Sequence, residues 1–309
     1  MSHLHSLLPA RSWLFVPGNR PDRFQKALDT AADKVIVDLE DSVPPTERVA
    51  ARAALASELA AGLADAPTAR LVARINAVGS ADFEADVDAL PLGKVGAVLA
   101  PKVDAVASVA ALERALVSRE AACGAAAKST GLVLLIESAR GVRDADGILE
   151  AAGGLGRRCA AAFGAMDFSV DVGTEGVGAD QELLYARSRL VVASRAAGLD
   201  GPFDSPCAQL RDAASVATEA VAARRLGFQG KLCVHPAQIA ACNEAFTPGD
   251  DALADARAVV AAYEAVESDG LGAVQHEGRM IDLPVVERAR RTLALAEQVA
   301  TTGEGRRHG

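Results

Sequence analysis

Eight short apolar runs, each followed by a segment with helical patterning, constrain the fold of this chain more than any other feature of its 309 residues. Runs of this length are typical of strands that are buried on both faces of a parallel sheet. Strict alternation of strand and helix predicts a parallel sheet with helices packed against it. The strands are expected at 12–17, 34–39, 69–75, 95–101, 132–136, 160–166, 198–206 and 228–236.

Eight strand–helix units in a chain of this length predict an α/β protein folded as a closed (β/α)8 TIM barrel. A doubly wound open sheet is the alternative, but no GxGxxG motif follows the first run to support a dinucleotide site. After the sixth run, a glycine-rich loop is expected at 168–180. Barrels of this kind place their chemistry at the carboxyl ends of the strands, so the polar residues there are the candidates for function.

The chain is expected to divide into a barrel at 1–247, which carries the functional site, and a C-terminal segment at 248–309. A polar linker is expected at 247–257, followed by two helical stretches that flank a small hairpin at 270–284. The segment is too small for a separate domain, and we expect a helical lid over its own barrel or over a neighbouring subunit. The last residues, 301–309, are expected to be disordered.

Composition narrows the class of protein. A net charge of −9 and a pI near 5.2 argue against a nucleic-acid partner, although they say little about a small anionic substrate. The five cysteines lack CxxC spacing and are typical of a reduced cytosolic protein. No apolar run reaches the ~18 residues that span a bilayer, and the N-terminus lacks the apolar core of a signal peptide. We therefore expect a cytoplasmic protein without a membrane partner.

Two apolar runs are followed by a single acidic residue, Glu137 after LVLLI and Asp167 after AAAFGAM. If these strands are neighbours in a parallel barrel, both carboxylates face one mouth. Two carboxylates, with other positions open to water or substrate oxygens, suit Mg²⁺, which is seldom enclosed by protein ligands alone. The alternative is a pair of unrelated surface or helix-capping acids.

A cluster of three acids, Asp38, Glu40 and Asp41, follows the second run. Three acids in one pocket raise a pKa unless cations pair with them, and Arg74 and Lys102 at the ends of the next two runs are the expected partners. The alternative is a set of acids favoured by a helix dipole. Arg74 either pairs with these carboxylates or forms a forked contact with a substrate carboxylate or carbonyl oxygen.

Five further side chains are candidates with a plainer alternative. Arg20 and Lys26, near the first turn and helix, suit a phosphate or simply a solvated helix face. Phe15 suits the core more often than a ligand contact. His235, without a second histidine at zinc-ligand spacing, is typical of a hydrogen-bonded structural group. Asp282 has apolar neighbours that would raise its pKa and suit acid/base work, but a helix cap is the plainer interpretation.

Eight motifs occur along the chain in the following order: RSWLFVPGN, KVIVDLEDSV, VARIN, APK, LLIESARGV, FGAMDF, LGFQGKLCVHPAQI and GRMIDLP. Taken together, they make the chain resemble the citrate lyase β-subunit-like family of the HpcH/HpaI aldolase superfamily. That family includes malyl-CoA and citramalyl-CoA lyases. The resemblance extends from about residue 11 to residue 297, which is nearly the whole chain.

The resemblance implies a TIM barrel with a C-terminal lid in a homo-oligomer, a trimer or a hexamer. It implies that Glu137 and Asp167 hold Mg²⁺ and that Arg74 binds the oxygens of the keto-acid fragment. Asp282 corresponds to the lid aspartate, an acid/base that reaches the site of an adjacent subunit. These roles are carried over from the family motifs.

The resemblance also implies a coenzyme A contact through Phe15, Arg20 and Lys26, with His235 near the thioester. Citrate lyase β-subunits, which act on citryl groups held by an acyl carrier, lack the two basic residues, so Arg20 and Lys26 favour a CoA thioester substrate. The segment GADQELLYAR differs from the EGTELLFAR type of those subunits, which leaves the substrate pocket open.

The expected activity is Mg²⁺-dependent carbon–carbon cleavage, or formation, of a 3-hydroxy-acid acyl-CoA thioester such as citramalyl-CoA, malyl-CoA or citryl-CoA. The products are a keto acid and acetyl-CoA. Two alternatives stay open: a carrier-dependent citrate lyase β-subunit, and an aldolase that acts on free hydroxy acids.

Overall fold

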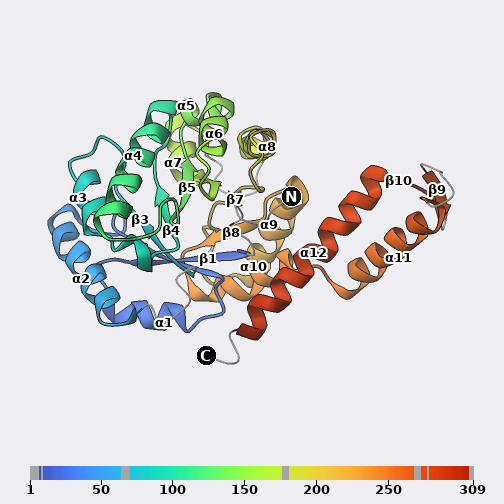
Figure 1. The fold of residues 1–309 in the computed structure, drawn as a ribbon, viewed down its shortest axis with the longest axis horizontal. Coiled ribbons are helices and arrows are strands. Elements are labelled where there is room, and N and C mark those ends of the chain that lie inside the picture. The colour runs from blue at the N-terminus through green and yellow to red at the C-terminus, as the bar shows by residue number, and fades with distance from the viewer. Residues whose placement is uncertain are drawn as a thin grey trace. The chain divides into compact units, whose positions relative to one another are not determined.

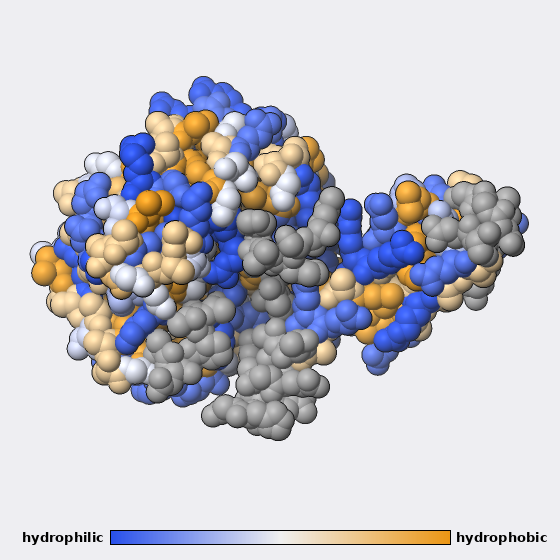
Figure 2. Space-filling model, viewed as in Figure 1, coloured by the Kyte–Doolittle hydropathy of each residue, from blue (hydrophilic) through white to orange (hydrophobic). Residues whose placement is uncertain are grey.

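The computed structural model of the chain describes residues 7, 10–63, 70–175, 181–267, 273–276 and 278–305. The chain forms two compact units, Met1–Phe246 and Thr247–Gly309. Hydrophilic residues cover much of the visible surface, with apolar residues in smaller groups (Figure 2).

The described residues of the first unit form a closed barrel of eight parallel strands in chain order, which confirms the predicted TIM barrel (Figure 1). The seventh strand is the shortest because prolines flank it on both sides. The strands are β1 (Ser12–Pro17), β2 (Lys34–Asp38), β3 (Leu71–Arg74), β4 (Ala97–Ala100), β5 (Gly131–Ile136), β6 (Cys159–Phe163), β7 (Phe203–Asp204) and β8 (Gly230–Cys233).

Helices surround the strands. They are α1 (Phe24–Leu28), α2 (Arg48–Ala60), α3 (Phe83–Ala89), α4 (Val106–Ala122), α5 (Ala139–Arg143), α6 (Ala145–Gly153), α7 (Ala165–Val172), α8 (Gln181–Ala196), α9 (Ala213–Leu226) and α10 (Ile239–Phe246). Helix α9 illustrates how the sequence sets their limits. The Asp212 side chain accepts the first free backbone N–H groups, and Gly227 ends the helix at φ 108°.

The strands are buried on both faces, which explains their continuous apolar runs. Alternate residues point inward and pack in the barrel interior, where the Trp13 and Phe203 rings lie 4.5 Å apart between centroids. The residues between them point outward against the helices. Beyond the interior layer, the same alternation aims the next inward residue of each strand at the carboxyl-end mouth.

The sixth unit differs from the prediction. Strand β6 ends at Phe163, and residues 165–172 form α7, so the expected strand to residue 166 and the expected loop from 168 are both wrong in this part. The run AAAFGAM is apolar throughout because it covers both a buried strand and the buried side of a helix, which hydrophobic periodicity does not separate. The rest of the expected loop, 176–180, lies outside the described residues.

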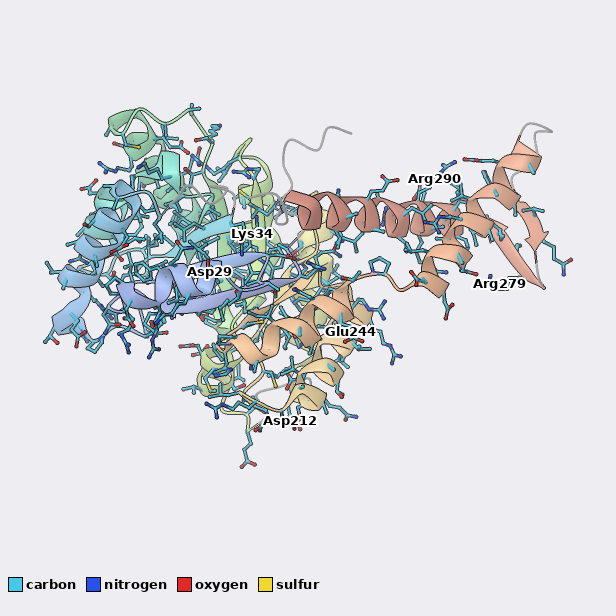
Figure 3. The ribbon with its side chains drawn as sticks, turned by 90° about the horizontal axis from the view of Figure 1, so that it is seen from below. Asp29, Lys34, Asp212, Glu244, Arg279 and Arg290 are labelled. Atoms are coloured by element: carbon cyan, nitrogen blue, oxygen red, sulfur yellow. The ribbon has the colours of Figure 1, made fainter. Side chains whose placement is uncertain are left out.

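The second unit has a small core of its own. Helices α11 (Asp250–Glu267) and α12 (Leu283–Gly305) pack with the antiparallel hairpin of β9 (Ala273–His276) and β10 (Arg279–Asp282). Tyr263, Ile281 and Val286 are buried there. Arg290 of α12, which is labelled in Figure 3, donates to Glu264 of α11 at 3.3 Å.

Two details of this unit differ from the prediction. The expected linker at 247–257 is helical from Asp250 onward. Helix α12 extends to Gly305, within the expected disordered end, and 306–309 lie outside the described residues. None of the helices in the described part of the chain combines the length and apolarity that crossing a membrane requires.

Candidate active site

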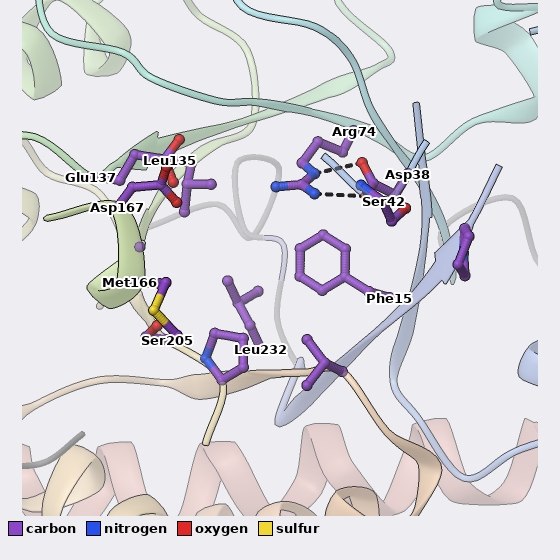
Figure 4. A pocket seen from close by; sticks show the side chains of 14 residues that line it. Phe15, Asp38, Ser42, Arg74, Leu135, Glu137, Met166, Asp167, Ser205 and Leu232 are labelled. Carbon is purple, nitrogen blue, oxygen red and sulfur yellow. Dashed lines mark hydrogen bonds and ion pairs between the residues drawn. The ribbon is translucent and has the colours of Figure 1, made fainter. Parts of the chain in front are cut away.

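A pocket of about 260 Å³ opens at the carboxyl-end mouth of the barrel (Figure 4). Its lining follows from the strand alternation, because most of these residues stand two positions after an inward-facing residue of the interior. Thus Asp38 follows Ile36, and Arg74 follows Val72. The lining residues are Phe15, Pro17, Asp38, Ser42, Arg74, Leu135, Glu137, Gly164, Met166, Asp167, Ser205, Pro206, Leu232 and Val234.

The two predicted metal ligands meet in this pocket. Figure 4 shows the Glu137 and Asp167 carboxylates next to each other, with Arg74 across the pocket. Glu137 is only 4% exposed. Burial, and then the charge of Asp167, raise the pKa of Glu137 to about 8. Among the described residues, no lysine or arginine forms an ion pair with either carboxylate.

Local structure holds Glu137 from two sides. The backbone N–H of Lys102 donates to Glu137 Oε1 at 2.8 Å. The β5–β6 register pairs Ile136 with Phe163, so the Glu137 side chain lies against Gly164. An added methyl group at Gly164 would lie 2.5 Å from the Cβ of Glu137, so the absence of a side chain there makes the position of Glu137 possible. Asp167 comes from the first turn of α7, not directly from a strand end.

The acidic cluster after β2 pairs with cations as predicted. Arg74 forms a forked contact with Asp38, with both nitrogen–oxygen distances at 2.6 Å. Burial by itself raises the pKa of Asp38, but Arg74 outweighs burial and the pKa is lowered. A third nitrogen of Arg74 lies 3.0 Å from Glu40 Oε2, and Lys102 Nζ lies 2.7 Å from Glu40 Oε1. Burial leaves the pKa of Glu40 raised despite these partners.

Arg74 also lies over an aromatic ring. Its guanidinium carbon is 4.9 Å from the centroid of Phe15, which is part of the pocket lining. The forked pair with Asp38 on one side and the ring beneath fix the guanidinium plane. Phe15 belongs to the core and to the pocket lining at once, because its ring packs against the barrel interior and also faces the pocket.

Four predicted site residues are outside the pocket lining. Arg20 is exposed and paired with Asp22 at 2.9 Å, and Lys26 is exposed on α1. His235 Nδ1 accepts the backbone N–H of Ala237 at 3.1 Å, in the structural role that a lone histidine suggests. Asp282 belongs to the second unit, where its Oδ1 accepts the backbone N–H of Val285 at 3.4 Å at the start of α12.

Several lining residues were not singled out in the sequence. Ser205 follows β7 and accepts the backbone N–H of Ala165 at 3.0 Å, which fixes the start of α7. Met166, Leu232 and Val234 add apolar walls. Strand alternation was the signal for Ser205 and Val234, because each lies two places after an interior residue, Phe203 or Leu232. Met166 lies on α7, where strand alternation gives no such signal.

The donor set of the site fits Mg²⁺. Carboxylates at this mouth outnumber the cations, and within the described ranges neither Glu137 nor Asp167 forms an ion pair with a lysine or arginine. Within the described part of the chain, no group of three or more histidine, cysteine, aspartate or glutamate side chains is arranged to hold a metal. A hard cation that binds one or two carboxylates and completes its shell with water or substrate oxygens matches this arrangement.

A closed parallel barrel with carboxylates and an arginine at its carboxyl-end mouth has the architecture of the TIM-barrel enzymes. Comparison with known proteins narrows this class. The family model described as HpcH/HpaI aldolase/citrate lyase matches residues 11–236. The chain belongs to the HpcH/HpaI aldolase/citrate lyase family, and it is a lyase of that family.

Three similar proteins illustrate the family. The citrate lyase subunit beta of Leuconostoc mesenteroides subsp. cremoris is 34% identical over 93% of each chain. The L-malyl-CoA/beta-methylmalyl-CoA lyase of Cereibacter sphaeroides is 33% identical over 94% of this chain and 96% of the relative. The crystal structure of CitE from Mycobacterium tuberculosis in complex with magnesium, acetoacetate and coenzyme A has a TM-score of 0.73 and 32% identity, covering 94% of this chain and 99% of that one.

Proposed function

We propose that this protein is a Mg²⁺-dependent carbon–carbon lyase that cleaves or forms a 3-hydroxy-acid acyl-CoA thioester, such as citramalyl-CoA, malyl-CoA or citryl-CoA. The products of cleavage are a keto acid and acetyl-CoA. The observation that carries the proposal is the Glu137–Asp167 pair, which lies across one pocket from Arg74. Glu137 is buried and Asp167 half-buried, and among the described residues neither forms an ion pair with a lysine or arginine. The magnesium and coenzyme A in the similar CitE structure, and the malyl-CoA lyase relative, support it.

Glu137 and Asp167 would hold the metal ion. When bound there, Mg²⁺ supplies Lewis-acid polarisation of the substrate hydroxyl and of the carbonyl oxygen that replaces it. Arg74 would bind the anionic keto-acid end, and its contacts with Asp38 and Glu40 restrict its rotamers before substrate arrives. The anionic substrate therefore meets an arginine whose orientation is already set.

Asp282 would exchange the proton on carbon. In cleavage, the hydroxyl proton of the substrate passes to water, the carbon–carbon bond breaks, and protonated Asp282 donates its proton to the acetyl carbon that receives the electron pair. Asp282 is then reprotonated from water. In condensation, Asp282 removes a proton from the acetyl methyl group. We propose that this residue acts on the site of an adjacent subunit in a homo-oligomer, a trimer or a hexamer, as the family resemblance implies.

The coenzyme A moiety would extend from the pocket at Phe15 to Arg20, Lys26 and His235 outside it. Arg20 and Lys26 are both exposed near Asp22. Arg20, and to a smaller extent Lys26, lowers the pKa of Asp22. Arg20 lies at the end of the turn after β1 and Lys26 lies on α1, and both are available to a phosphate once Arg20 leaves its surface ion pair, which is worth little in water. We propose a cytoplasmic location, in keeping with the five free cysteines.

A mass-spectrometric condensation assay tests the proposal. The protein is mixed with Mg²⁺, acetyl-CoA and one of three keto acids (pyruvate, oxaloacetate or glyoxylate) in separate reactions. An adduct in at least one reaction, abolished by EDTA, is expected. Failure of all three, with folded protein that binds Mg²⁺, would contradict the proposal and favour a free-acid aldolase or a carrier-dependent subunit.

A further inference from the structure

Lys102 has an unusual backbone conformation beside the candidate metal site. Its φ of 54° lies in the left-handed region, which only Lys128 shares among the described residues other than glycine. Residues with a Cβ seldom adopt this conformation unless their surroundings impose it. Lys102 lies just beyond β4, where the chain passes between β3 and β5.

The left-handed residue redirects the hydrogen bonds of the chain. The β4–β5 ladder ends where Ala100 pairs with Leu134. Three residues later, Val103 donates its N–H to the backbone carbonyl of Leu135 at 3.2 Å. This leaves the N–H of Lys102 for a side chain, and it donates to Glu137 Oε1 at 2.8 Å.

The side chain of Lys102 reaches in another direction. Its ammonium group lies 2.7 Å from Glu40 Oε1, and the opposite oxygen of Glu40 lies 3.0 Å from Arg74. Glu40 is 3% exposed, so loss of one partner would leave a buried carboxylate poorly compensated. The backbone of Lys102 therefore contacts Glu137, the candidate metal ligand. Its side chain contacts Glu40, which pairs with Arg74, the candidate for substrate binding.

We propose that Lys102 is a positioning residue that sets the geometry between Glu137 and Arg74. Its left-handed backbone aims the N–H that orients Glu137 toward Asp167, and its ammonium holds Glu40 against Arg74. The inference rests on the proposed metal role of Glu137, and its first test measures metal binding without turnover.

The backbone role is tested by a series in which every variant lacks the ammonium group. Lys102→Gly accepts the left-handed conformation, Lys102→Ala resists it, and Lys102→Val resists it most because it is β-branched. Titration calorimetry with Mg²⁺ alone should give a Kd for Lys102→Gly within about threefold of the wild type. Lys102→Val should bind at least about tenfold more weakly, as expected when a partner of a metal ligand is lost, with Lys102→Ala between them.

The side-chain role is tested with Lys102→Met, which keeps the length and the backbone preference of lysine but removes the charge. We expect its Mg²⁺ affinity to stay within about threefold of the wild type, and its KM for the preferred keto acid to rise at least about tenfold as Arg74 loses its alignment. Lys102→Arg, which keeps a cation at this position, should have a KM between those of Lys102→Met and the wild type.

Thermal unfolding and circular dichroism establish that each variant is folded. If Lys102→Val does not fold, the Mg²⁺ affinities of Lys102→Gly and Lys102→Ala are compared instead, and they decide the backbone role. Equal Mg²⁺ affinities across the series would overturn the backbone role, and a wild-type KM for Lys102→Met would overturn the side-chain role. If the wild type condenses no keto acid with acetyl-CoA, the proposed function fails, yet the Mg²⁺ series still decides the backbone role.

Discussion

Gly164 leaves the space that the Glu137 side chain occupies. Because a methyl group there would overlap the carboxylate, Gly164→Ala must displace Glu137 or the start of α7. We expect this variant to bind Mg²⁺ at least about tenfold more weakly in titration calorimetry. Gly154→Ala is the matched control, because its added methyl group meets only backbone oxygens at 3.6 Å. Unchanged affinity in Gly164→Ala would show that Glu137 does not need its present position.

The two carboxylates should also determine whether the metal stabilises the fold. A ligand that binds only the native state adds about 2.7 kcal/mol to the free energy of unfolding at 100 times its Kd. We expect a Mg²⁺-dependent rise in melting temperature for the wild type, and none for Glu137→Gln or Asp167→Asn. Glu150→Gln, a change at an exposed position of α6, should retain the rise. A wild-type response in Glu137→Gln would remove Glu137 from the metal site.

For single residues, the sequence predicts the charged side chains of the pocket better than its apolar lining. Glu137 and Arg74 were found because each is a charged residue at the end of a continuous apolar run. Leu232 and Gly164 are apolar residues within or next to such runs and do not stand out in the sequence. Their role depends on which face of a strand points inward. The paired state of Arg74 was one of two readings in the sequence, and the burial of Asp38 and Glu40 accounts for it.

Between the barrel and its helices, β7, β8 and α8 are joined by a buried ionic network. Arg187 forms a forked contact with Asp204 at 3.1 and 3.0 Å, and Lys231 Nζ lies 3.0 Å from the same aspartate. Burial by itself raises the pKa of Asp204, but Lys231 and Arg187 outweigh burial, and the pKa is lowered. Glu219 of α9, 3.0 Å from Lys231, extends the network.

Asp204→Asn should therefore destabilise the barrel in a pH-dependent way. It leaves two buried cations short of a partner, which costs about 3–5 kcal/mol at pH 7. Because the folded pKa of Asp204 lies below its unfolded value, the ionised group stabilises the native state above about pH 3.9. That contribution is lost as the pH falls through the folded pKa.

Urea unfolding at a series of pH values measures how the contribution of Asp204 to the free energy of unfolding depends on pH. The difference between Asp204→Asn and the wild type should shrink below about pH 3.9. Asp88→Asn, at an exposed position of α3, should change little at any pH. A difference that stays constant down to the acid limit would mean that packing, and not ionisation, explains the effect.

The sequence predicts the strands and the long helices better than the shortest helices. Helix α4 follows from the helical patterning after the fourth run, because its buried apolar positions repeat over several turns. Helix α5 has only 5 residues, too few for a period to emerge. Helix α7 has no side-chain cap at Gly164, so nothing in the sequence separates it from the apolar strand before it.

The whole molecule consists of two units with separate cores. Among the described residues, the barrel cores contain nothing beyond Phe246, and the core of the second unit lies entirely within its own helices and hairpin. Each unit therefore buries apolar surface by itself, which is the main requirement for independent folding.

A chain that ends at Phe246 should fold, bind Mg²⁺ like the full chain, and lack lyase activity because Asp282 is absent. Full-length Asp282→Asn should reproduce the loss, with turnover reduced by about 10²-fold or more and Mg²⁺ affinity unchanged. Circular dichroism, calorimetry and the condensation assay measure the three properties. Full activity in either protein would exclude Asp282 from proton transfer.

The Trp13–Phe203 pair fills the barrel interior one layer before the pocket residues Phe15 and Ser205, so the pocket is closed at its base and opens at the carboxyl-end mouth. Under the proposed function, the keto acid lies at the base of the pocket near Glu137 and Arg74, and the larger thioester lies between it and the mouth. Acetyl-CoA would then leave before the keto acid, and a keto acid that stays bound would inhibit the next turnover.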